Sequence, residues 1–201
     1  MVPASLTSRY LLSASIPDPR RAPMYYKTAD LTAIREAVTA VSTVALKRGE
    51  LVFGGHPAIS PLVLIVASAL DATDRVRIYQ SEHFRDQIPP ESTAFRRLVW
   101  TPRVGTDRQA SLREMRETMI GGGGFAAAFF IGGMEGVEEE FALFRERWPN
   151  VPAFPIASTG AAARRLLDRW ASSLSFLSTE RVRQLRDDVV YAALVERLLE
   201  L

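Results

Sequence analysis

Short apolar runs alternate along this chain with longer stretches whose apolar residues recur every three or four positions. The short runs are typical of buried strands, and the recurring pattern is typical of amphipathic helices. The predicted strands are Tyr10–Ser15, Leu51–Phe53, Val76–Gln80, Leu98–Trp100, Ala126–Ile131 and Val151–Ile156. The predicted helices are Asp30–Arg48, Ser60–Leu70, Arg108–Ile120, Val137–Trp148, Ala161–Leu174 and Thr179–Leu201. We expect Gly49 to end the first helix and Ser60 to cap the start of the second.

The regular alternation of strands and helices favours an α/β fold. Parallel strands need crossovers of helix length, so we expect a mainly parallel, doubly wound, Rossmann-like sheet in three layers, with about six strands and helices on both faces. Residues 1–175 are expected to form this domain. The wide apolar stripe of the helix within residues 176–201 is expected to pack either on the domain or on a dimer partner.

Four of the predicted strands end in small or glycine-rich turns. These turns are Ser13-Ala14-Ser15, Gly54-Gly55, Gly132-Gly133 and Thr159-Gly160. In a parallel sheet all four lie at the carboxyl edge, where open α/β sheets bind their ligands. One such turn is equally typical of an ordinary tight turn, but four at a shared edge predict a cleft of nucleotide size.

The turn after the fifth strand leads into a helix that begins with three carboxylates, Glu138, Glu139 and Glu140. They either offset the helix dipole, at up to about 1 kcal/mol each, or one of them accepts hydrogen bonds from ribose hydroxyls. Three carboxylates repel phosphate, so a phosphate is expected at another turn. The favoured seat is Gly54-Gly55-His56, because no acid lies near it in the sequence and the helix start at Ser60-Pro61 follows.

The composition excludes several classes of protein. A formal net charge of +2 and a pI of about 9.2 give no strong case for nucleic-acid binding. The chain has no Cys and two His, so we predict no thiolate nucleophile, no metal site and no cofactor. No signal peptide is recognised, and the longest apolar segment, Pro61–Leu70, is too short to span a bilayer. We therefore expect a cytoplasmic protein without a membrane partner.

The motifs resemble the SLOG superfamily, which groups the LOG-type enzymes with the DNA-uptake protein DprA and with ligand-sensing domains of bacterial defence proteins. The LOG-type enzymes carry Pro-Gly-Gly-x-Gly-Thr-x-Glu-Glu after a buried strand, and Ile131–Glu140 reads Ile-Gly-Gly-Met-Glu-Gly-Val-Glu-Glu-Glu. Arg116 resembles an Arg that precedes the motif in those enzymes. Leu51–Gly55 is similar to the second-strand Val-Tyr-Gly-Gly of the family, and Ser13-Ala14-Ser15 is similar to its first-strand turn. The resemblance covers residues 10–165.

The chain departs from the enzyme motif at three places. Ile131 replaces the Pro, Val137 replaces the Thr, and one extra residue precedes Gly136. This variant is similar to the sensing branches of the superfamily, whose ligands are nucleotide-derived signals related to NAD or ADP-ribose. Because of the extra residue, two carboxylates can match the catalytic Glu of the enzymes. Glu139 is the better match and Glu140 is the alternative.

The resemblance and the strand-end turns together imply a ligand site. Its predicted residues are Ser13, Ser15, Arg20, Gly54, Gly55, Arg116, Gly132, Gly133, Gly136, Glu139, Thr159 and Gly160. Arg20, Arg21 and Arg103 follow strand ends and are either phosphate forks or surface residues. Arg116 is either a solvated helix residue or a side chain at the mouth of the cleft.

Two functions follow from the resemblance. In the first, the domain senses an NAD- or ADP-ribose-related signal in a bacterial defence or signalling system and acts through an effector partner. SLOG relatives commonly pair, which implies a homodimer or a higher homo-oligomer. The alternative is a LOG-like phosphoribohydrolase that cleaves the N-glycosidic bond of a nucleoside monophosphate, with Glu139 and Arg116 as catalytic residues. DprA-like binding of single-stranded DNA is disfavoured, because the sequence has no basic stripe interleaved with aromatic residues.

Overall fold

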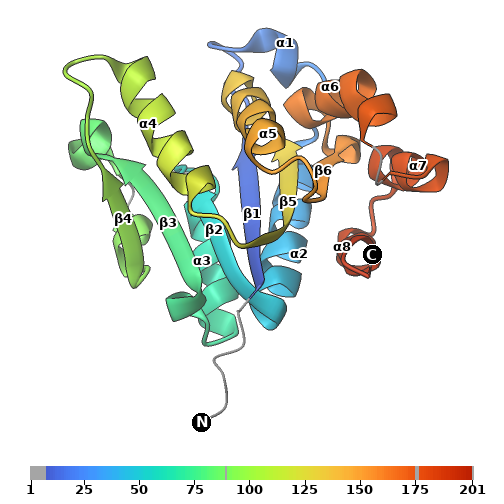
Figure 1. The fold of residues 1–201 in the computed structure, drawn as a ribbon, viewed down its shortest axis with the longest axis horizontal. Helices are drawn as coiled ribbons and strands as arrows, with labels where there is room; N and C mark the ends of the chain where they lie inside the picture. Colours follow the sequence, from blue (N-terminus) through green and yellow to red (C-terminus); the bar gives the residue numbers. More distant parts are fainter. Residues whose placement is uncertain (1–7, 89, 175–176, 201) are drawn as a thin grey trace.

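A six-stranded parallel sheet forms the centre of the molecule (Figure 1). The computed structural model describes residues 8–88, 90–174 and 177–200, so the last residue of the predicted C-terminal helix lies outside it. The strands are β1 (Ser8–Ser15), β2 (Gly49–Gly54), β3 (Val76–Ser81), β4 (Arg97–Thr101), β5 (Phe125–Gly132) and β6 (Ala153–Ile156). Their order across the sheet is β4-β3-β2-β1-β5-β6, and each neighbouring pair is parallel.

Helices cover both faces of the sheet, and the predicted three-layer, Rossmann-like α/β fold is confirmed (Figure 1). One face packs against α2 (Leu31–Arg48) and α3 (Ser60–Ala69), and α8 (Tyr191–Leu198) packs on α2 and adds to the same core. The other packs against α4 (Arg108–Gly121), α5 (Glu135–Arg147) and α6 (Ala161–Trp170). The shorter helices are α1 (Pro23–Tyr26), α7 (Thr179–Asp187) and the 3₁₀ turns Thr73–Arg75, Glu82–Gln87, Pro90–Ala94, Ala157–Thr159 and Ala171–Ser173. Among the described helices, none is both long enough and apolar enough to cross a membrane.

Successive residues of the central strands enter opposite cores. Leu11 of β1 belongs to the core under α4 and α5, together with Phe130. Leu12 belongs to the core under α2 and α3, together with Phe53. Because both faces of the sheet are buried, the strands read as continuous apolar runs and not as alternating ones.

The chain reverses direction once as it crosses the sheet. From β1 it proceeds outward through β2 and β3 to β4, and it then returns to place β5 on the other side of β1. The helices α2 and α3 lie on one face, and α4 and α5 lie on the other. The connections leaving β1 and β5 therefore separate at the carboxyl edge, and open α/β sheets bind ligands at such a switch point.

The end of α2 and the start of α3 differ in detail from what the sequence predicts. Gly49 ends α2 as predicted, but its backbone is extended, with φ of 178°. Glycine is required there because a Cβ would lie 1.9 Å from the carbonyl oxygen of Ser8 on the adjacent strand. The prediction that Ser60 caps α3 is wrong, because Ile59 holds the cap position. The Ser60 hydroxyl instead accepts the backbone N–H of His56 at 3.2 Å.

The predicted C-terminal helix is divided into α7 and α8 by residues 188–190. Asp188 has an extended backbone, and its Oδ1 accepts the N–H of Val190 at 2.8 Å, which ends the first helix. The second helix packs against α2 and buries Tyr191 and Leu194 in the core. These contacts join the C-terminal region to the rest of the chain.

Candidate functional site

A hollow of about 160 Å³ lies at the carboxyl ends of β1 and β2, between α4 and the start of α5. Four segments that are distant in the sequence line it, and they meet at the switch point of the sheet. Its polar and charged lining residues are Ser15, Arg21, His56, Arg108, Arg116 and Glu140. The volume is below the range of about 300–1,000 Å³ that is usual for a whole small-molecule site. The hollow therefore has room for a sugar or a phosphate group, and the rest of a nucleotide would extend beyond it.

Arg116 and Glu140 form an ion pair in the hollow. Nε of Arg116 lies 3.4 Å from Oε1 of Glu140, and 11% and 13% of the two side chains are exposed. Arg116 also pairs with Glu139 through Nη1. The Glu139 side chain is 55% exposed and lines an outer groove of about 620 Å³ between α4 and α5. Of the two carboxylates that match the enzyme motif, Glu140 thus lies in the hollow and Glu139 lies outside it.

The environment of Glu140 favours its protonated form. Burial raises the pKa of this carboxyl above its usual value, and the charge of Arg116 offsets only part of that effect. The buried hydroxyl of Ser13 is close enough to act on the same pKa, but it makes no hydrogen bond of regular geometry with any described residue. A buried carboxyl with a raised pKa can transfer a proton or accept a hydrogen bond from a sugar hydroxyl.

Positive charge dominates the rest of the hollow. Arg21 comes from the loop after β1, and Arg108 is the first residue of α4, where its guanidinium lies 5.6 Å from the ring centre of Phe84. With Arg116, three arginines line the hollow, and Glu140 is the single carboxylate among the lining residues. Guanidinium forks match phosphate oxygens in both charge and geometry. No group of three His, Asp or Glu side chains in the described part of the chain is placed to hold a metal ion.

His56 lines the hollow as a neutral imidazole. Burial lowers its pKa to about 4, and the charge of Arg21 acts in the same direction. Its Nδ1 accepts the backbone N–H of Ala58 at 3.2 Å. We therefore assign the proton of the neutral ring to Nε2, which makes this nitrogen a hydrogen-bond donor.

The glycines of the hollow allow side chains to approach the backbone closely. A Cβ on Gly136 would lie 2.7 Å from Nη2 of Arg116, and a Cβ on Gly55 would lie 1.9 Å from Nε2 of Gln80. At Gly54 the nearest atom would be Cε of Met115, at 3.3 Å. These three glycines line the hollow, and the absence of a Cβ at each position leaves room for the neighbouring side chain.

The other predicted glycines lie outside the lining of the hollow and stabilise the fold. Gly132 and Gly133 were predicted as residues of the ligand site, but their N–H groups donate to Oγ1 of Thr159 at 2.9 Å and to the carbonyl of Ser15 at 2.8 Å. Gly160 has a φ of 74°, and a Cβ on it would lie 1.8 Å from the carbonyl oxygen of Thr28. The turns at Gly132-Gly133 and Gly160 therefore connect β5, β6 and the start of α2. The N–H groups of these three glycines donate within the fold and not to the hollow.

The arginines that line the hollow differ from those predicted from the sequence. Both Arg20 and Arg21 are exposed, but Arg20 is absent from the lining of the hollow, whereas Arg21 is part of it. Arg108 was not predicted, although positions 108, 112, 115 and 116 share one face of α4 and all line the hollow. That pattern was present in the sequence, but the apolar stripe at 112, 115 and 119 is equally typical of a helix that packs on a core.

The sequence model of the SLOG cluster3 family matches residues 24–199, which include each described strand after β1 and the helices from α2 to α8. The match begins after the β1 turn and extends through the C-terminal helices, which the motif resemblance did not cover. No curated protein matches the chain.

Proposed function

Because the chain belongs to the SLOG cluster3 family, we propose that its hollow binds a nucleotide-derived small molecule related to NAD or ADP-ribose and that the protein senses this molecule. The family assignment supports a nucleotide-related function in general. The observation that carries the finer proposal is the Arg116–Glu140 pair at the switch point, within a lining rich in guanidiniums.

The distribution of charged and polar groups in the lining suggests how the ligand is oriented in the hollow. Phosphate oxygens bind on the β2 side, where Arg21 and Arg108 supply positive charge and the neutral His56 supplies an N–H donor. Ribose hydroxyls bind on the β1 side, where Glu140 accepts hydrogen bonds and Ser15 lines the hollow, whereas the predicted Ser13 is buried and outside the lining. The base lies outside, at the open carboxyl edge.

Arg116 connects the hollow to a second surface. It lines both the hollow and the outer groove between α4 and α5, where it pairs with Glu139. A ligand that engages this guanidinium changes the charge presented in the groove. We propose that the effector of the sensor is a partner protein of a bacterial defence or signalling system and that the chain acts as a homodimer or higher homo-oligomer.

The raised pKa of Glu140 favours one alternative function. A carboxyl that holds a proton can act as the general acid of a phosphoribohydrolase acting on a nucleoside monophosphate, and Arg116 can bind its phosphate or sugar. In this alternative Glu140 takes the catalytic role for which Glu139 is the better motif match, because Glu140 is the carboxylate in the hollow.

Calorimetric titration with ADP-ribose, NAD and AMP tests the sensor, and chromatography of the same mixtures detects any free base. We expect saturable binding without product, weakened at least tenfold by Glu140→Gln and by Arg116→Gln. Glu139→Gln is the matched control and should change the affinity less than threefold, because this side chain is half exposed and outside the hollow. Base release that is abolished by Glu140→Gln would establish the hydrolase instead. Absence of binding by all three compounds would overturn both functions.

A further inference from the structure

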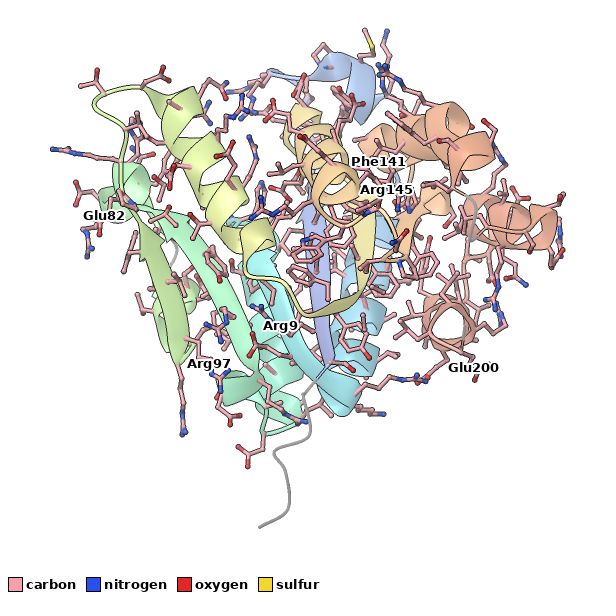
Figure 2. All side chains as sticks on the ribbon, viewed as in Figure 1. Arg9, Glu82, Arg97, Phe141, Arg145 and Glu200 are labelled. Atoms are coloured by element: carbon pink, nitrogen blue, oxygen red, sulfur yellow. The ribbon has the colours of Figure 1, made fainter. Side chains whose placement is uncertain are left out.

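Three arginines surround one glutamate at the edge of the sheet opposite the hollow. Arg9, Glu50 and Arg77 are the second residues of β1, β2 and β3, and Arg97 is the first residue of β4. The residues two positions further along these strands pack in or against the core under α4, so the four side chains share that face of the sheet. Figure 2 labels Arg9 and Arg97 in the lower half of the view, below Phe141 of α5.

Both carboxylate oxygens of Glu50 accept hydrogen bonds from these arginines. Its Oε1 accepts from Nε of Arg9 at 3.2 Å and from Nε of Arg77 at 2.8 Å. Its Oε2 accepts from Nη2 of Arg77 at 3.4 Å and from Nη1 of Arg97 at 2.6 Å. Burial by itself raises the pKa of Glu50, but the hydrogen bond and charge of Arg77, with the charges of Arg9 and Arg97, outweigh it and hold the pKa below its usual value. The glutamate is therefore ionised and has no free acceptor position for a further cation.

The cluster has a surplus of positive charge. Three guanidiniums against one carboxylate leave two charges unmatched among the described ion pairs of this cluster. Arg9 also donates to the carbonyls of Gly122 and Gly123, at the end of α4. Arg77 and Arg97 face each other across β3 and β4, where like charges repel. Their side chains are 32% and 46% exposed, so their remaining N–H donors can be reached from solvent.

We propose that Arg77 and Arg97 form a binding site for a phosphate group, either as free phosphate or as part of a larger molecule. An oxyanion bridging the two guanidiniums accepts from donors that Glu50 leaves unused, and it relieves the repulsion between the facing charges. At about 3.3 Å per residue, the length of the strands separates this site from the hollow by roughly 15–25 Å. The two sites are thus independent, and this one does not rest on the function proposed for the hollow.

The test follows the arginine Nε–Hε signals in nitrogen-15 NMR spectra while inorganic phosphate is added, with chloride at equal ionic strength as reference. The hollow is disabled in this experiment by Arg21→Gln with Arg108→Gln, so that phosphate bound there does not contribute. We expect the signals of Arg77 and Arg97 to shift saturably with phosphate and to remain unchanged with chloride. A parallel titration with AMP distinguishes the two sources: shifts in both series indicate that the site accepts a phosphate carried by a larger molecule, and shifts with phosphate alone restrict it to the free ion.

Matched variants decide whether these residues form the site. Arg97→Gln should weaken phosphate binding at least fivefold, and Arg97→Lys should weaken it less, because the charge remains but the fork is lost. Arg96→Gln is the control, because Arg96 is the exposed neighbour and pairs with no carboxylate in the described structure. Equal weakening by Arg96→Gln, or signals of Arg77 and Arg97 that respond alike to phosphate and chloride, would overturn the proposal. The unfolding temperature in chloride verifies that each variant is folded.

Discussion

The backbone of Gly136 is in close contact with the guanidinium of Arg116, and a Cβ at position 136 would lie 2.7 Å from Nη2. Gly136 is in the first turn of α5, and Glu140 lies one turn further along the same helix face. The side chain of Arg116 therefore passes over Gly136 to reach the carboxylate in the hollow. The geometry of the ion pair depends on the absence of a side chain at position 136.

Gly136→Ala should separate ligand binding from stability. The added methyl meets the flexible end of Arg116 and displaces it, so we expect the affinity for ADP-ribose in a calorimetric titration to fall at least fivefold. The free energy of unfolding should stay the same or rise by up to about 1 kcal/mol, because alanine is the better helix former. Gly121→Ala at the end of α4 is the control, since a Cβ there meets no described atom within 4 Å. Unchanged affinity in Gly136→Ala would contradict the role assigned to Arg116.

The cluster around Glu50 should make stability depend on pH. Its pKa is lowered in the folded state, so its contribution to the free energy of unfolding is complete above the usual value of 4.5 and is lost as the pH falls through the lower folded pKa. At pH 7, Glu50→Gln should destabilise the protein by about 2–3 kcal/mol, less than the roughly 3–5 kcal/mol of a fully buried pair because Arg97 is half exposed.

Urea unfolding at pH 7, 5 and 3 measures this effect. The natural protein should lose more stability than Glu50→Gln between pH 5 and pH 3, because the variant has no carboxylate to protonate at this position. Glu36→Gln, at an exposed position of α2, should follow the natural protein throughout. If the free energy of unfolding falls equally with pH in the natural protein and in Glu50→Gln, the ionised carboxylate of Glu50 does not stabilise the folded protein.

The imidazole of His56 should titrate far below its usual range. Burial and the nearby Arg21 lower its pKa to about 4, so ligand binding should show no step from His56 between pH 5.5 and pH 8. The chain has two histidines, and His83→Gln leaves a single imidazole whose proton NMR signals can be followed with pH. A midpoint of about 4 is expected. A midpoint near 6.5 would mean that the ring is solvated and is not part of the hollow.

Gly160→Ala should destabilise the fold more than Gly105→Ala. Both residues have positive φ, 74° and 53°, so both substitutions strain the backbone by roughly 1–3 kcal/mol. Only at position 160 would the new Cβ also collide with a backbone atom, the carbonyl oxygen of Thr28 at 1.8 Å. We expect Gly160→Ala to cost at least about 3 kcal/mol in the free energy of unfolding. Similar losses in both variants would indicate that Gly160 is required for its backbone angle alone.

The sequence by itself determined the six strands, the helices between them and the edge of the sheet that carries the hollow. These features follow from local periodicity and from turn residues at strand ends, and both can be read within a few neighbouring positions. The expectation that Gly54 and Gly55 lie at this edge follows from the same reasoning, because strand ends of a parallel sheet share one edge. Arg116 was predicted there only from the resemblance to the SLOG superfamily, because it lies on a helix and not at a strand end.

Only the tertiary structure decided which of several adjacent, chemically similar residues enters the hollow. Glu139 and Glu140 are consecutive, but one residue turns a helix by about 100°, so the contacts of α5 with β1 and α4 bring Glu140 inward and leave Glu139 in the outer groove. The N–H groups of Gly132 and Gly133 illustrate the same limit. Their partners, Thr159 and Ser15, are distant in the sequence, and a hydrogen bond across such a distance exists only once the chain has folded.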